Sequence, residues 1–150
     1  MKVVLQRVTE AAVRVDGQIV GQIGRGFVAL IGIKETDTPA IADKMAEKIS
    51  KLRIFGDENG KTNLCAADVN GEILVVSQFT LYADCRKGNR PSFTNAAPQA
   101  QAEELYEHFA DTCEPLFART DRGQFGADMQ VSLTNDGPFT ITLDSDELTP

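Results

Sequence analysis

Four consecutive residues, Ser77-Gln78-Phe79-Thr80, interrupt the segment EILVVSQFTLY, which has the strongest strand pattern in the sequence. Two hydroxyls and a carboxamide close together could supply a nucleophile, or hydrogen bonds to a developing negative charge. We expect a strand over 72–82, whose alternation sends Ser77 and Phe79 to one face and Gln78 and Thr80 to the other. The structural alternative is a strand whose end simply reaches the surface.

A second unusual segment is Asn135-Asp136-Gly137-Pro138. Asp-Gly is a favoured pair in hairpin turns, and the flanking ranges 129–133 and 139–143 have strand patterns. Pro138 fits an ordinary hairpin poorly, because it lacks a donor where the next strand should begin to pair and it restricts the residue before it. An X-Pro bond in a tight turn is also a place where a cis peptide occurs. A plain turn and a functional loop both remain open.

The usual catalytic and metal-binding patterns are absent from the sequence. GxSxG, HExxH, the phosphate-binding GxxxxGK[ST] and a GxGxxG after a strand do not occur. The single histidine, His108, falls among acidic residues of an expected helix, which favours a solvated surface residue over a catalytic base. Cys65, Cys85 and Cys113 form no CxxC pair, so we expect reduced thiols, no metal and no cofactor. Chemistry is then left to hydroxyls, backbone groups or the substrate itself.

The elements that must position these segments indicate a single α+β domain over residues 1–150. One helix is predicted to begin at the capping residue Thr38 with Pro39 in its first turn, and a second to follow Pro98. Hairpins early and late in the chain favour a largely antiparallel, strongly curved, barrel-like sheet with two main helices. The predicted strands cover 2–8, 11–15, 18–23, 27–33, 72–82, 129–133 and 139–143, and residues 144–150 are expected to form a frayed tail.

Composition and charge narrow the class of protein. With 150 residues, 42% hydrophobic and 25% charged, the chain has the profile of a soluble globular domain, not of a disordered or collagen-like chain. A net charge of −7 excludes a protein that coats nucleic acid along its phosphates, but not one that grips only its end. One loop, residues 83–97, is locally basic through Arg86, Lys87 and Arg90. Without a recognisable signal peptide or membrane-spanning run, we expect a cytoplasmic protein with no membrane partner.

Three segments together are similar to the motifs of one family. SQFTL at 77–81, KGNRPSF at 87–93 and MQVSLTNDGPFT at 129–140 resemble the D-aminoacyl-tRNA deacylase family of chirality-editing hydrolases, and QRVTEAAVRVDG, GRGFVALIGI and KLRIFGDENGKTNL fit it too. The resemblance covers nearly the whole chain. It implies a homodimer that hydrolyses the ester between a D-amino acid, or misattached glycine, and the 3′-terminal adenosine of tRNA. The implied partner is therefore the aminoacylated CCA end.

The resemblance also implies roles for individual residues. A cis Gly137-Pro138 pair would reach across the dimer into the partner's active site and exclude an L side chain by a steric clash, with Arg7 as its brace. Phe125 and Met129 would surround the terminal adenine. The possible contacts with RNA phosphates are Arg86, Lys87 and Arg90.

The resemblance makes Ser77, Gln78, Phe79 and Thr80 the catalytic segment, with two routes open. Thr80 could act as the nucleophile, but it needs a nearby base, and the sequence offers none. Alternatively, the 2′-hydroxyl of the terminal adenosine assists water while backbone N–H groups around Phe79 and Thr80 stabilise the oxyanion, and we favour this route. The rival function class is a non-catalytic oligomeric binding or scaffold module, which the missing triad would suit.

Overall fold

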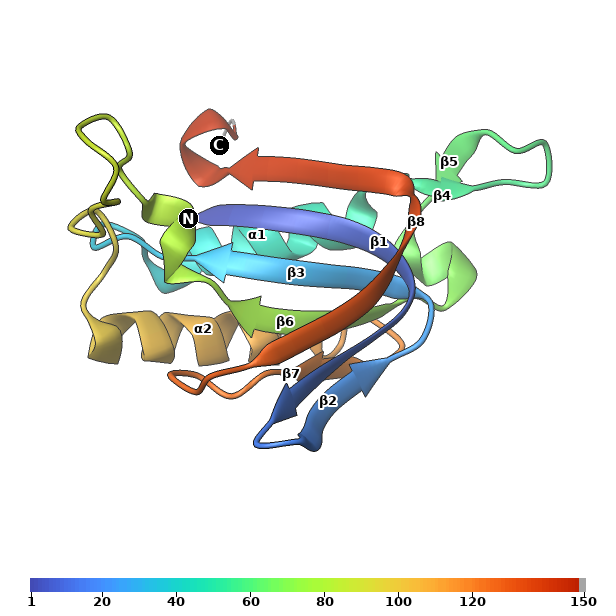
Figure 1. The fold of residues 1–150 in the computed structure, drawn as a ribbon. Helices are drawn as coiled ribbons and strands as arrows, with labels where there is room; N and C mark the ends of the chain where they lie inside the picture. Colours follow the sequence, from blue (N-terminus) through green and yellow to red (C-terminus); the bar gives the residue numbers. More distant parts are fainter. Residues whose placement is uncertain (149–150) are drawn as a thin grey trace.

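Six strands form one sheet that curls round on itself (Figure 1). This computed structural model describes residues 1–148 of the chain. The spatial order is β2-β1-β3-β6-β7, with β8 paired to the other side of β1. At the two ends of that order, the backbone N–H of Gln22 in β2 donates to the Asp121 carboxylate of β7 at 2.7 Å. The sheet is therefore a nearly closed barrel of β1 (Lys2–Val15), β2 (Gln18–Ile23), β3 (Gly26–Gly32), β6 (Glu72–Ser77), β7 (Thr120–Arg122) and β8 (Gln130–Asp144).

A close backbone approach makes this closure possible at Gly21 of β2. A Cβ at this position would lie 2.6 Å from the carbonyl oxygen of Arg122 in β7, well inside van der Waals contact. Only a residue without a side chain lets the two strands come this near.

The expectation of a largely antiparallel sheet is wrong, because the sheet is mixed. β3 pairs with β6 in parallel, and β6 pairs with β7 in parallel. Each parallel pair needs a crossover connection, and the two α-helices supply them. Helix α1 (Pro39–Lys51) lies between β3 and β6 in the chain, and α2 (Gln99–Cys113) lies between β6 and β7. The short strand β7 is not among the strands predicted from the sequence, so its parallel pairing with β6 was not predicted either.

The two longest strands, β1 and β8, run antiparallel along their whole lengths. One edge of β1 pairs first with β3 and then with β2, whereas β8 follows the other edge from Lys2↔Asp144 to Arg14↔Gln130. Residues 135–138 therefore do not turn a hairpin, because the segments on both sides pair with β1 and not with each other. The predicted strand pairs 2–8 with 11–15 and 129–133 with 139–143 are each one continuous strand.

Strand β6 ends earlier than the sequence indicates. The Gln78 N–H still donates to Ile31 O of β3 at 2.7 Å, but the Leu81 N–H turns back to Gln78 O at 3.2 Å. The chain thereby enters a 3₁₀-helix, η2 (Phe79–Tyr82). The predicted alternation of faces holds only as far as Ser77.

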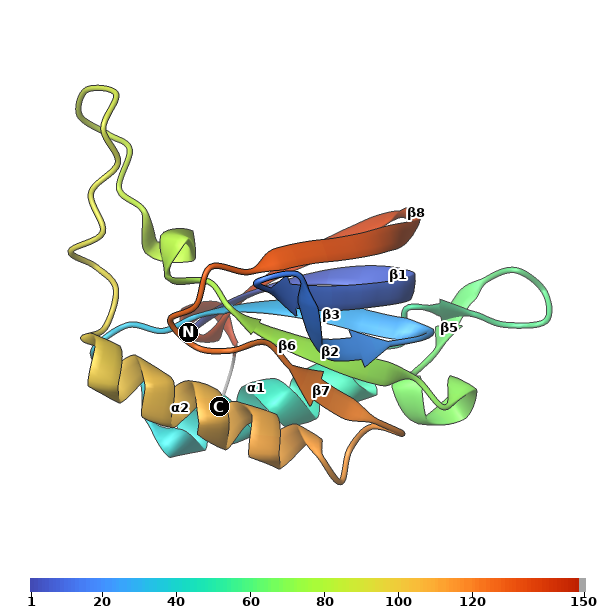
Figure 2. The same cartoon turned by 60° about the horizontal axis from the view of Figure 1, so that its bottom comes forward.

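Both α-helices cover one face of the sheet, and the core lies between the two layers (Figure 2). The hydroxyl of Thr38 caps α1 by accepting the Ile41 N–H at 3.3 Å, and Pro39 occupies the first turn, as predicted. The second helix begins directly after Pro98, also as predicted. The largest fully buried side chains are Tyr106, Phe27, Phe55 and Phe109.

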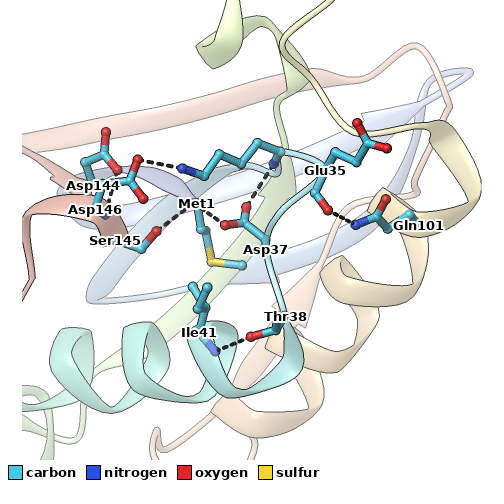
Figure 3. A network of polar contacts seen from close by, with 10 residues as sticks. Met1, Glu35, Asp37, Thr38, Ile41, Gln101, Asp144, Ser145 and Asp146 are labelled. Carbon is cyan, nitrogen blue, oxygen red and sulfur yellow. Dashed lines mark hydrogen bonds and ion pairs between the residues drawn. The ribbon is translucent and has the colours of Figure 1, made fainter. Parts of the chain in front are cut away.

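The C-terminal segment differs from the expected frayed tail as far as residue 148. Asp144 ends β8, and residues 145–147 form a 3₁₀-helix, η3 (Ser145–Glu147). The Met1 amino group lies between Asp37 and Ser145 (Figure 3) and donates to their side chains at 2.6 and 2.8 Å. Lys34 forms an ion pair with Asp146 of this segment. Residues 149 and 150, the end of the expected tail, lie outside the described residues.

Smaller elements complete the described chain. A two-stranded ribbon of β4 (Phe55–Gly56) and β5 (Thr62–Leu64) projects from one end of the sheet, and η1 (Ala66–Val69) precedes β6 (Figure 2). None of the helices within residues 1–148 has the length and apolar character needed to cross a membrane.

Candidate active site

A cavity of about 620 Å³ opens where β3 and β6 end and α2 begins. This volume is in the range of small-molecule binding sites. Its wall is largely apolar, with a few polar groups from Ser77, Gln78, Gln99 and Asp128. Three sequence segments that are far apart supply most of the lining: Val76, Ser77, Gln78 and Phe79; Phe93, Ala96, Ala97, Gln99 and Ala102; and Phe125, Gly126, Ala127, Asp128, Met129 and Val131.

The predicted catalytic segment bends at this cavity. Ser77 is the last residue of β6, and Gln78 has an irregular backbone conformation (φ −144°, ψ 76°) that leads into η2. This bend lets Ser77, Gln78 and Phe79 all line the cavity, which a continuous strand would not allow. Thr80 is not part of the described lining, and its Oγ1 accepts a hydrogen bond from Gln78 Nε2 at 2.5 Å.

Two aromatic rings meet at the cavity. The rings of Phe79 and Phe93 pack edge to face with 5.1 Å between centroids, although 54% and 39% of these residues are exposed. Exposed aromatic pairs of this kind offer flat surface to a ligand at little entropic cost. Phe93 belongs to the basic loop, residues 83–97, so this loop contributes to the cavity wall.

Phe125 and Met129 also line the cavity, and buried residues pack against both side chains. The buried Tyr106 hydroxyl donates to Val75 O at 2.8 Å, and its ring lies 5.7 Å from that of Phe125. Gly123 makes room for Met129, because a Cβ there would lie 2.6 Å from the Met129 sulfur. Both side chains are thus held in place as an apolar surface of the cavity.

The basic loop 83–97 extends away from the body of the molecule (Figure 2). An isolated bridge between Asp84 and Ser92 closes its base. Arg86 donates to both oxygens of Asp84, at 2.9 and 2.7 Å, and these hydrogen bonds lower the pKa of that carboxyl to about 2. One of the loop's positive charges is therefore paired, whereas Lys87 and Arg90 are exposed and appear in no ion pair within residues 1–148.

The segment Asp136–Phe139 bulges out of β8. Gln6 pairs with Thr140 and Val8 with Asn135, so these four residues stand opposite Arg7 alone. Arg7 Nε donates to Asp136 O at 2.9 Å and lies 3.5 Å from the Asp136 carboxylate. The Gly137-Pro138 peptide bond within the bulge is cis.

Arg7 also ties the bulge to a neighbouring element. Its Nη1 donates to Ile54 O, just before β4, at 2.6 Å, and its guanidinium lies 4.3 Å from the centroid of the Phe139 ring. The structure thus places Arg7 against the segment that the resemblance assigns it to.

The bulge and the cavity lie at different places along β3. Arg7 pairs with Phe27 at the start of β3, whereas Ser77 pairs with Ile31, four residues further on and about 13 Å along the strand. Within the described chain, Gly137, Pro138 and Arg7 do not line the cavity. The structure therefore groups the predicted site residues into two separate sets.

Comparisons with known proteins decide the family. A family model described as D-Tyr-tRNA(Tyr) deacylase matches residues 4–144. A D-aminoacyl-tRNA deacylase of Lactobacillus gasseri is 56% identical, covering 96% of this chain and 99% of its own, and that of Thermosipho africanus is 52% identical, covering 97% of each. The chain belongs to the D-Tyr-tRNA(Tyr) deacylase family.

Two solved structures resemble this chain over nearly its whole length. A structure described as c-Myc DNA Unwinding Element Binding Protein has a TM-score of 0.89 and 44% identity, covering 96% of this chain and 98% of its own. A structure described as a probable eukaryotic D-amino acid tRNA deacylase has a TM-score of 0.82 over 95% and 97% of the two chains. At 16% identity, the second shows that the fold is shared.

Several residues around the candidate site carry no clear signal in the sequence of this deacylase family member. Gln99 and Asp128 line the cavity, but both are single polar residues without a distinctive spacing. From the sequence, Asn135 is expected only to lead into a turn. Its side chain in fact bonds to both backbone groups of Phe139 and to Arg7 O. The Asn directly before Asp-Gly-Pro was the only sequence signal for this role. In a simple hairpin turn, its side chain would have had no partner in Arg7.

Other candidate groups of this deacylase family member lie elsewhere. His108 is not free in solvent, because its Nε2 lies 2.7 Å from Asp43 Oδ1 of α1. No cluster of three or more His, Cys, Asp or Glu that could hold a metal ion is found in the part of the chain that the structure describes. Burial raises the pKa of the Cys113 thiol to about 12, so this cysteine is unreactive at neutral pH.

Proposed function

We propose that this protein is an aminoacyl-tRNA editing hydrolase, which cleaves the ester between a D-amino acid, or mischarged glycine, and the 3′-terminal adenosine of tRNA. The observation that carries the proposal is the convergence of Ser77, Gln78 and Phe79 with Phe125 and Met129 on one cavity, in a chain of this family. The proposed substrate end, an aminoacyl-adenosine, is a small-molecule-sized group that suits a cavity of about 620 Å³.

The adenine of the substrate would lie against Phe125 and Met129. A purine offers a flat π-face, and stacking on an aromatic side chain is worth about 1–3 kcal/mol per base. Tyr106 supports the Phe125 ring from the core, so the surface is preorganised before the substrate arrives. The exposed Phe79 and Phe93 pair offers a second flat surface for the rest of the CCA end.

The ester would be hydrolysed with help from the substrate's own 2′-hydroxyl. Among the described residues that line the cavity, only Asp128 has a titratable side chain, and it is exposed to solvent. The described cavity wall therefore offers no buried general base to activate water. The Thr80 hydroxyl already accepts the Gln78 amide and has no basic group bonded to it within residues 1–148. The backbone N–H groups of Phe79 and Thr80 begin η2 and lack acceptors inside that helix, which makes them available to an oxyanion.

Selection against L-amino acids would come from a second copy of the chain. The Gly137-Pro138 bulge lies outside its own chain's cavity, but it projects from β8 where a partner's cavity could receive it. A homodimer would then complete each cavity with backbone atoms from the other subunit. A rigid backbone that fills the space of an L side chain would spare L-aminoacyl-tRNA, whereas D-amino acids and glycine would fit.

The basic loop would meet tRNA phosphates near the CCA end. Lys87 and Arg90 are exposed, and Phe93 places the base of the loop at the cavity. An acidic protein that binds only the end of tRNA needs few such contacts.

The test is a deacylation assay with D-aminoacyl-, glycyl- and L-aminoacyl-tRNA. The proposal predicts release of the first two amino acids and sparing of the third. A non-catalytic binding role, which the DNA-binding name of one similar solved structure would suit, predicts tRNA or DNA binding without accelerated release of any amino acid. That result would overturn the proposal.

A further inference from the structure

The antiparallel ladder between β1 and β8 has a gap at Arg7. On either side of it, Gln6 and Val8 have partners in β8, but Arg7 has none, because residues 136–139 leave the plane of the sheet. A buried or half-buried carbonyl without a donor is costly, so a gap of this kind needs another group to fill it.

The side-chain amide of Asn135 fills the gap. Its Nδ2 donates to Arg7 O at 3.1 Å, where a backbone N–H of β8 would donate in an unbroken ladder. The same Nδ2 donates to Phe139 O at 2.9 Å, and Oδ1 accepts the Phe139 N–H at 2.8 Å. The amide thus pairs with both backbone groups of Phe139, as a neighbouring strand would, and closes the bulge at its base.

These contacts set where the middle of the bulge lies. Because Asn135 and Phe139 are held together, Asp136, Gly137 and Pro138 must span a short distance. Within this span the backbone leaves no room for a side chain on Gly137, because a Cβ there would lie 2.4 Å from Phe139 N, two residues further along the chain. A second contact comes from Arg7, whose Nε donates to Asp136 O at 2.9 Å. Gly137 and Pro138 are exposed, and the residues on either side of them, Asp136 and Phe139, are held by Arg7 and Asn135.

We infer that Asn135 is a positioning residue for chiral selection: its side-chain amide fixes the shape in which the Gly137-Pro138 backbone is presented to a partner's cavity. This inference rests on the proposed function, since it assigns a residue to the rejection of L-aminoacyl-tRNA. The role requires a carboxamide, because the site uses two donations and one acceptance from a single short side chain.

Two substitutions of Asn135 distinguish the effect of its hydrogen bonds from the effect of its size. Asn135→Asp keeps the size and the acceptor for the Phe139 N–H but loses both donations, and Asn135→Ala loses all three bonds. Thr134→Ala, an exposed neighbour in β8 without a hydrogen bond from its side chain among the described residues, is the matched control. For each protein, the hydrogen-exchange rate of the Phe139 amide and the ratio of D- to L-aminoacyl-tRNA cleavage are measured.

We expect the D/L ratio to fall at least about tenfold in Asn135→Asp and further in Asn135→Ala, as weakened hydrogen bonds let the bulge shift. Exchange of the Phe139 amide should accelerate most in Asn135→Ala, and Thr134→Ala should match the wild type in both measurements. A D/L ratio that stays at the wild-type value in Asn135→Asp and Asn135→Ala would overturn the inference.

Failure of the underlying function is distinguishable from failure of this inference. If the wild-type protein hydrolyses neither D-aminoacyl- nor glycyl-tRNA, the proposed function is wrong and the selection role of Asn135 falls with it. If the wild type is active and selective while the variants keep their selectivity, the function stands and Asn135 merely completes the sheet.

Discussion

The Thr80 hydroxyl accepts the Gln78 side-chain amide at 2.5 Å and stands outside the described cavity lining, an arrangement that suits a structural role better than that of a nucleophile. Thr80→Ala is therefore expected to lose less than about tenfold in kcat/KM, whereas removing a true serine nucleophile costs about 10⁶-fold in kcat. The companion measurement uses D-aminoacyl-tRNA with a 2′-deoxy terminal adenosine, which should react very slowly. Equal turnover of the deoxy and ribo substrates would restore the side-chain nucleophile.

Gly137 tests the bulge itself. A Cβ there would lie 2.4 Å from Phe139 N and 2.8 Å from Phe139 Cβ, so Gly137→Ala must move the backbone. Because the residue is exposed, the fold should survive with a near-wild-type melting temperature, while D-aminoacyl-tRNA cleavage falls at least about tenfold. Gly56→Ala is the matched control, since a Cβ on Gly56 would meet nothing within 4 Å. Full activity and selectivity in Gly137→Ala would mean that the shape of the bulge does not matter.

The sequence could reveal a site residue only where the pattern around it is local. It could not reveal one whose contacts lie far along the chain. Ser77, Phe125 and Met129 belong to recognisable segments, and the fold brings these segments together at one cavity. Asn135 acts through Arg7, 128 positions away, and through a register gap that exists only once β8 pairs with β1. A pattern of neighbouring residues carries no information about such a gap.

At the scale of elements, a polar contact joins the two helices. Asp43 of α1 accepts the Thr112 hydroxyl at 2.9 Å and contacts His108 of α2 at 2.7 Å. The hydrogen bond from Thr112, and then that from His108, lower the pKa of the Asp43 carboxyl below 3.8. A carboxyl whose pKa is lower in the folded than in the unfolded state stabilises the fold above the unfolded value, and this contribution is lost as the pH falls through the lowered pKa.

Asp43→Asn should therefore reduce the free energy of unfolding at pH 7 by less than about 1 kcal/mol, because Asp43 and His108 are both partly exposed and solvent screens their interaction. The difference from the wild type should shrink as the pH is lowered from 5 toward 2, because the wild-type carboxyl, with its lowered pKa, loses its charge in this range. Urea unfolding across this pH range measures the difference in the free energy of unfolding. Thr112→Val is a second variant, which removes the hydrogen bond from the Thr112 hydroxyl to Asp43. A difference that grows as the pH falls from 5 toward 2 would contradict this assignment.

The elements that the sequence predicted well are those whose signals are local. Thr38 and Pro39 start α1, and Pro98 precedes α2, because caps and prolines act within one helical turn. The mixed sheet was missed because strand partnership is not local. The chain also leaves β6 at Ser77 although the apolar pattern continues, since η2 takes over the backbone bonds.

At the scale of the whole molecule, the barrel separates two parts of one proposed site. The cavity opens at the end of β6, while the bulge projects from β8 beside β4, and β3 spans the distance between them. In a symmetric dimer, a contact between patch A and patch B on different subunits is made twice. Two copies of this chain can thus complete two cavities at once, which a monomer with a rigid barrel cannot do.

Mixed dimers test this arrangement directly. Ala96→Trp should fill the cavity from its half-exposed rim, and Gly137→Ala should displace the bulge, so each variant alone should keep at most about a tenth of the wild-type activity. In a mixed dimer, the cavity of the Gly137→Ala subunit is intact and receives an intact bulge from the Ala96→Trp subunit. Random pairing of equal amounts makes half of the dimers mixed, with one good site in two, so about a quarter of wild-type activity should return. Each variant paired with itself is the control. If the bulge instead served its own chain's cavity, no mixture of the two variants would regain activity.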